Sequence, residues 1–186
     1  MDRNQAFELL TRYVKGEIVL KHSLAVESSM RQMAKFYGED VEAYGLTGLL
    51  HDIDYEKSPQ THPFSGTPIL LDANVPLEII AAILGHATEA SQRKTRMAKA
   101  LFAVDELSSF VIACALMRPS KSYDDLEVSS VTKKLKSNSF AKGVDRNLVE
   151  QGAKELGLER NVLIEEVIKG LRIREKELNA MGYSTL

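Results

Sequence analysis

Apolar residues recur at intervals of three and four along most of the chain, with polar residues between them. This spacing is typical of helices that bury one face, whereas strands give a strict alternation. No stretch shows alternating β-branched residues separated by hairpin turns. The pattern therefore predicts an all-α fold, with helices over residues 16–37, 40–52, 65–72, 76–87, 94–117, 123–136, 145–156 and 159–178.

Several residues mark where these helices should begin and end. Gly38 is suited to a helix C-terminus, and Asp40 is a good N-cap for the next helix. Pro76 fits the first turn of a helix, and Pro119 should end the long apolar helix before it. Residues 54–61 are polar and contain a proline, so we expect a loop there.

The 186 residues fit one compact domain. After Pro119 the sequence is richer in Ser, Lys and Asp, and the amphipathic segments become weaker. We therefore expect a helical core over residues 1–120. Residues 121–186 should form a small C-terminal helical extension packed on the same domain.

Charge and composition narrow the classes of partner. The net charge of −2 provides no basic field for a nucleic-acid duplex. No apolar run approaches the roughly 18 residues of a bilayer-spanning helix, and no leader-like segment is visible. Cys114, the one cysteine, suits a reducing compartment. These features predict a cytoplasmic protein without a membrane or duplex partner, and they leave the oligomeric state open.

Asp105 is an acid in an otherwise apolar helix, since residues 98–104 are almost all apolar. We expect it to be largely buried. A buried carboxylate without a partner costs on the order of several kcal/mol, and a bound cation removes that cost. The alternative is a structural aspartate satisfied by backbone N–H groups or by a salt bridge.

His51 and Asp52 are adjacent, so a regular helix would point them about 100° apart. Both can reach one metal ion only near a helix end, and the polar loop that follows places them there. His22 lies on the inward stripe of the first long helix. Taken alone, a histidine at such a position is more often a hydrogen-bonded core residue than a metal ligand.

Together, His22, the pair His51-Asp52 and Asp105 on three apolar helices resemble the H…HD…D signature of the HD-domain superfamily of metal-dependent phosphohydrolases. The resemblance covers about residues 17–117 and includes the segment 49–54, Leu-Leu-His-Asp-Ile-Asp. It implies an all-helical HD fold with a metal site made of these four residues. The C-terminal third carries no such motif.

His62 and His86 occupy the places where some HD proteins have two additional histidines, a pattern that implies two metal ions. By that resemblance, His22, His51, Asp52 and Asp105 hold one ion, and His62, His86 and a bridging Asp52 hold the second. The alternatives are that His62 is an ordinary loop histidine and that His86 is a histidine at a helix C-terminus. Nitrogen and oxygen ligands favour one or two divalent ions of Fe, Mn, Zn, Ni or Co.

The resemblance implies hydrolysis of a phosphoester or phosphoanhydride in a small phosphorylated molecule, with a nucleotide as the analogy within the superfamily. The metal ions would activate water and neutralise phosphoryl charge. Three residues are candidates for catalysis: Asp52 as a metal ligand, and Asp54 and Glu56 to orient the water or protonate the leaving group. The candidates for phosphate contact, each of which could instead be a surface residue, are Lys57, Arg118 and Lys121.

Other functions remain open from the sequence. The segment His51-Asp-Ile-Asp54 departs from the HDIG turn, and no GYP tripeptide occurs, which disfavours cyclic-dinucleotide hydrolysis. The six-ligand pattern also resembles HD-fold diiron oxygenases, which need iron and O₂. A third alternative is a noncatalytic helical module, binding or regulatory, whose core is stabilised by metal.

Overall fold

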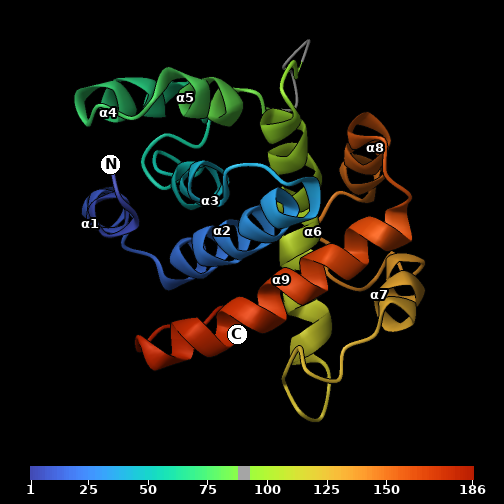
Figure 1. Ribbon diagram of the computed structural model, residues 1–186. Coiled ribbons are helices and arrows are strands. Elements are labelled where there is room, and N and C mark those ends of the chain that lie inside the picture. Colours follow the sequence, from blue (N-terminus) through green and yellow to red (C-terminus); the bar gives the residue numbers. More distant parts are fainter. Residues whose placement is uncertain (88–92) are drawn as a thin grey trace.

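The computed structural model describes residues 1–87 and 93–186 (Figure 1). All regular structure in these two ranges is helical, which confirms the predicted all-α class. The elements are α1 (Arg3–Tyr13), α2 (Glu17–Tyr37), α3 (Val41–Leu50), the 3-10 turn η1 (Phe64–Gly66), α4 (Thr67–Asp72), α5 (Leu77–Leu84), α6 (Arg96–Leu116), α7 (Val128–Leu135), α8 (Arg146–Leu156) and α9 (Arg160–Ala180).

Helix α2 is the centre of the molecule, since all residues from 23 to 34 are buried (Figure 1). It packs against α3, α6 and α9. Two glycines allow other helices to cross α2 closely. A Cβ atom at Gly48 of α3 would lie 2.7 Å from the carbonyl oxygen of Val26, and one at Gly170 of α9 would lie 2.8 Å from that of Ser28. The backbones of α3 and α9 therefore approach α2 more closely than any larger residue would allow.

The ends of α2 and α3 follow the predicted signals. Gly38 has a left-handed backbone with φ of 69°, and its N–H donates to the carbonyl oxygen of Ala34. The Asp40 carboxylate accepts from the backbone N–H groups of Glu42 and Ala43. Helix α3 ends at Leu50, and His51, its C-cap, still has a helical backbone, so the pair lies at the helix end as expected.

The sequence analysis missed one helix and gave two others the wrong extent. Helix α1 was not predicted, although Asp2 and Gln5 form a capping box at its start. Helix α5 ends at Leu84 instead of residue 87, because the chain turns there and the N–H of His86 donates to the carbonyl oxygen of Ile83. The predicted helix over 123–136 is helical only over Val128–Leu135.

The C-terminal helices share the core with the rest of the chain. Helix α9 packs along α2 and α6, and α8 packs on α6 (Figure 1). The division of the chain at residue 120 stays a prediction. No helix in the described ranges combines the length and the apolar character needed to cross a bilayer.

Candidate metal centre

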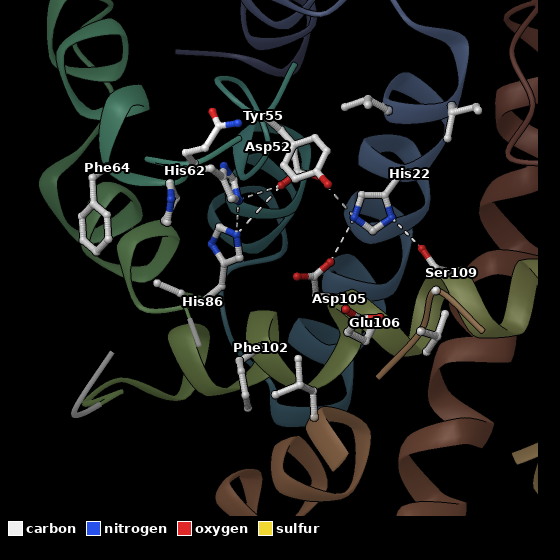
Figure 2. A pocket seen from close by; sticks show the side chains of 18 residues that line it. His22, Asp52, Tyr55, His62, Phe64, His86, Phe102, Asp105, Glu106 and Ser109 are labelled. Carbon is white, nitrogen blue, oxygen red and sulfur yellow. Dashed lines mark hydrogen bonds and ion pairs between the residues drawn. The ribbon is translucent and has the colours of Figure 1, made fainter. Parts of the chain in front are cut away.

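Five segments of the chain bring the six predicted ligands together (Figure 2). His22 comes from α2, the pair His51-Asp52 follows α3, and Asp105 comes from α6. The remaining two, His62 and His86, lie in the turns before η1 and after α5. Figure 2 shows His22 and Asp105 on one side of Asp52, with His62 and His86 on the other.

The first side of the cluster joins three ligand atoms. The Nε2 atom of His22 lies 3.1 Å from the Nε2 atom of His51 and 3.0 Å from Oδ1 of Asp105. The distance from His51 Nε2 to the same aspartate oxygen is 3.5 Å. These three residues form one group whose donor atoms could hold a metal ion.

Asp52 links this group to the second side. Its Oδ2 lies 3.5 Å from His22 Nε2, while its Oδ1 lies 3.3 Å from His51 Nε2 and 3.2 Å from His62 Nε2. The Nε2 atoms of His62 and His86 are 2.9 Å apart. A second group of potential ligands consists of His51, Asp52 and His86. Asp52 therefore occupies a bridging position between two sets of imidazoles.

Groups behind the cluster fix the orientation of the histidine rings. The Nδ1 atoms of His51 and His86 face the carbonyl oxygens of Gly48 at 2.8 Å and Ile83 at 2.5 Å. A carbonyl oxygen only accepts, so in both rings Nδ1 carries the proton and Nε2 points inward. Such partners behind the ligands are typical of histidines that bind metal.

The other two histidines are held by side chains. The Nδ1 atom of His62 lies 2.6 Å from Oδ1 of Asp54, and that of His22 lies 3.0 Å from the hydroxyl oxygen of Ser109. Asp54 is buried and holds its histidine through a carboxylate, which raises the basicity of the inward nitrogen. All four rings thus turn Nε2 toward the cluster.

The carboxylates shift the pKa values of the histidines strongly. Burial alone would lower the pKa of His22, but Asp105 and Asp52 outweigh it and raise the pKa to about 9. The pKa of His62 is likewise raised to about 9, because Asp52 and Asp54 outweigh its burial. Burial and the charge of His51 lower the pKa of His86 to about 4. The aspartate side chains therefore favour positive charge next to His22 and His62.

The donor set fits a divalent metal ion. Ligand atoms about 2.1 Å from one ion lie about 3.0 to 3.4 Å apart in octahedral or tetrahedral geometry, and the two close Nε2 pairs have similar separations. In His62 and His86, the Nδ1 protons face Asp54 and a backbone carbonyl. The two inward Nε2 atoms lie 2.9 Å apart, so they can share either a proton or a divalent cation.

Five of the six candidate ligands line a cavity of about 710 Å³, and the sixth, His51, is fully buried. Asp105 is largely buried, as expected, and its side chain is 24% exposed where it faces this space. The remaining lining residues are mostly apolar or aromatic. They are Ile18, Val19, Tyr55, Gln60, Pro63, Phe64, Ala87, Phe102, Glu106, Ser109, Gly143, Val144 and Leu148.

The other predicted site residues lie outside this cavity. Asp54 is behind His62, and the exposed Glu56 accepts from the backbone N–H groups of Lys15 and Gly16 before α2. None of the three candidate phosphate contacts lines the cavity. Lys57 stacks over Tyr13, Arg118 pairs with Asp125, and Lys121 is exposed after α6.

The sequence analysis missed several residues that line the cavity. Ser109 lies one turn after Asp105 on α6, so helical spacing could have placed it beside the cluster. Glu106 follows Asp105 directly, and burial together with the charge of Asp105 raises its pKa to about 7. Val144 and Leu148 come from the C-terminal third, and no local pattern indicates their packing against α6.

The fold and the cluster define a class of protein: an all-helical protein with a buried histidine and aspartate site suited to divalent metal ions. Residues 19–109 match the family model of the HD domain, and the chain therefore contains an HD domain. The match spans His22, the pair His51-Asp52 and Asp105. The comparisons with curated proteins and with solved structures gave no match.

Proposed function

We propose that this protein is a metal-dependent phosphohydrolase that uses water to cleave a phosphoester or phosphoanhydride bond in a small molecule. One observation carries the proposal: six histidine and aspartate side chains converge within an HD domain, and five of them line a cavity of about 710 Å³. A cavity of this volume is typical of small-molecule sites. A cytoplasmic location belongs to the same proposal.

The ligand roles follow from the two sides of the cluster. His22, His51 and Asp105 would hold one ion, His62 and His86 the second, and Asp52 would contact both. Bound divalent ions would supply water that deprotonates near neutral pH and would neutralise charge on phosphoryl oxygens. Asp54 and Ser109 keep the rings of His62 and His22 in the orientation that binding requires.

The first experiment measures metal identity and stoichiometry by elemental mass spectrometry on untagged protein. Wild type is compared with Asp52→Ala and with a His62→Ala/His86→Ala double variant. We expect close to two transition-metal ions per chain in wild type, close to one in the double variant and almost none in Asp52→Ala. A wild type that carries no metal even after reconstitution would overturn the proposal.

A second experiment identifies the chemistry. Reconstituted protein is assayed for phosphate release from phosphoesters and phosphoanhydrides, with and without oxygen. Hydrolysis that proceeds anaerobically with Mn or Co supports the proposal. Oxygen consumption that requires iron would instead identify an HD-fold oxygenase, and bound metal without turnover on any substrate would identify a metal-stabilised binding module.

A further inference from the structure

The walls above the metal cluster are predominantly apolar. Their apolar residues include Phe102 of α6, Val144 before α8, Leu148 within α8, Val19 of α2, and Pro63. Apolar walls bind a ligand by removing its apolar surface from water, at about 25 cal/mol per Å². The part of the substrate above the cluster therefore meets few hydrogen-bonding groups.

The mouth of the cavity is apolar as well. Ile18, Phe64 and Tyr55 line it, and they are 84%, 57% and 46% exposed. The ring of Tyr55 lies 5.3 Å from that of His62, and Figure 2 shows Phe64 farther out on the His62 side of the cluster. A single exposed apolar residue is ordinary on a protein surface, but a group of them beside a cavity indicates contact with a ligand.

Positive charge is missing from these walls. No lysine or arginine is among the residues of the described ranges that line the cavity, and residues 88–92 contain neither type in their sequence. Arg93, which stacks on the ring of Phe102, is paired with Glu155. Glu106 presents a carboxyl group to the cavity, and a carboxyl group provides no positive charge in either protonation state. An anion bound above the cluster would therefore lose water without gaining a partner.

We propose that the substrate is a phosphomonoester whose alcohol or phenol part is apolar and carries no further anionic group. This inference rests on the proposed hydrolase function. In the reaction, water adds to phosphorus, the ester P–O bond breaks, and a proton of the water passes to the leaving oxygen. The products are inorganic phosphate and an uncharged alcohol or phenol that fits the apolar walls.

Three phosphonates that cannot be hydrolysed test separately whether an apolar group strengthens binding and whether a further anion weakens it. Methylphosphonate carries only the phosphoryl group, benzylphosphonate adds an apolar ring, and 4-carboxybenzylphosphonate adds a second anion to that ring. Binding to the metal-reconstituted protein is measured by isothermal titration calorimetry. We expect benzylphosphonate to bind about tenfold more tightly than methylphosphonate, and the carboxylated compound to lose most of that gain.

Variants at the mouth test the contact directly. The double variant Ile18→Ala/Phe64→Ala should weaken benzylphosphonate binding about fivefold and leave methylphosphonate binding unchanged. Both side chains are largely exposed, so the variant should fold normally. Leu77→Ala is the matched control, because Leu77 is 72% exposed and does not line the cavity. Turnover of 1-naphthyl phosphate should exceed that of glycerol 2-phosphate in kcat/KM.

The outcomes distinguish the two proposals. If metal-loaded protein neither binds methylphosphonate nor releases phosphate from either ester, the hydrolase function fails, and the substrate inference fails with it. If methylphosphonate binds and both esters are hydrolysed, but the ring gives no gain or the carboxylated ring binds equally well, only the substrate inference is overturned.

Discussion

The orientation of each ligand histidine depends on the group behind it. Asp54 is buried and contacts Nδ1 of His62 at 2.6 Å, so it acts on the cluster without facing the cavity. Asp54→Asn keeps the volume but removes the charge. We expect metal affinity to fall about tenfold or more, since changes to such partners typically cost 10- to 100-fold.

Competition with a chromophoric chelator measures this affinity. Glu56→Gln is the matched control, because Glu56 is a nearby acid that contacts only the backbone before α2. Its metal affinity should equal that of wild type. Equal affinity in the Asp54 and Glu56 variants would contradict the positioning role of Asp54.

Four of the six candidate ligands carry a local signal, whereas His62 and His86 were predicted only from the resemblance to HD proteins. Helical spacing places His22 and Asp105 on inward faces, and the helix end allows His51 and Asp52 to converge. The roles assigned to Glu56 and Arg118 had no such basis, because the direction of an exposed charge depends on what packs beside it. Glu56 contacts the backbone at the start of α2. Arg118 lies about 20 Å from Asp105, beyond the far end of α6.

The crossing of α2 and α3 carries both His22 and the residues that follow α3. A Cβ atom at Gly48 would lie 2.7 Å from the Val26 carbonyl oxygen and 2.9 Å from the Cα atom of Glu27. These are backbone atoms, so the helices must separate to accommodate it. Gly48→Ala should therefore lower the free energy of unfolding by about 2 kcal/mol, as overpacking does.

Urea denaturation of the metal-free protein measures this loss. Gly143→Ala is the control, because a Cβ atom there would meet nothing within 4 Å. Its free energy of unfolding should stay within about 0.5 kcal/mol of wild type. A Gly48→Ala variant as stable as the control would show that the two helices can separate freely.

Helices with strong periodicity and clear caps were predictable: α2 ends at the point that Gly38 indicates, and α3 begins at the point that Asp40 indicates. The C-terminal end of α5 was not predictable, because the turn that carries His86 sets it. The contribution of α8 to the cavity was also beyond a local pattern, since Leu148 reaches the site only through packing on α6.

A buried ion network ties the N-terminal and C-terminal helices together. Glu27 of α2 is fully buried and accepts from Arg3 of α1 at 2.7 Å, from Arg31 at 2.9 Å and from Arg174 of α9 at 3.5 Å. Removing one partner of a buried pair leaves charge unpaired, at a typical cost of 3 to 5 kcal/mol. Glu27→Gln should lower the free energy of unfolding by about 3 kcal/mol.

The matched control is Glu42→Gln, because Glu42 also pairs with Arg31 but its side chain is 66% exposed. Exposed pairs contribute about 1 kcal/mol or less, so this variant should remain close to wild type. Chemical denaturation of both variants gives the comparison. Similar losses in the two would mean that burial adds little to the network.

Metal binding should stabilise the whole fold, because His22 and Asp105 are far apart in the sequence and meet only when α2 and α6 pack. A ligand that binds only the folded state adds about 2.7 kcal/mol at 100 times its Kd. For a chain of this length, the Tm should rise by about 5 to 10 °C. Differential scanning calorimetry of chelator-treated protein, with and without added Mn²⁺ or Zn²⁺, measures the shift.

Asp105→Ala removes a ligand and should lose most of this Tm shift, whereas the surface variant Asp125→Asn should retain it. The comparison matters because a metal bound to scattered surface acids would raise the Tm of both variants alike. A shift that survives in Asp105→Ala would therefore place the metal outside the cluster. A shift that disappears only in this variant would tie the stability of the bundle to the residues that the HD domain brings together.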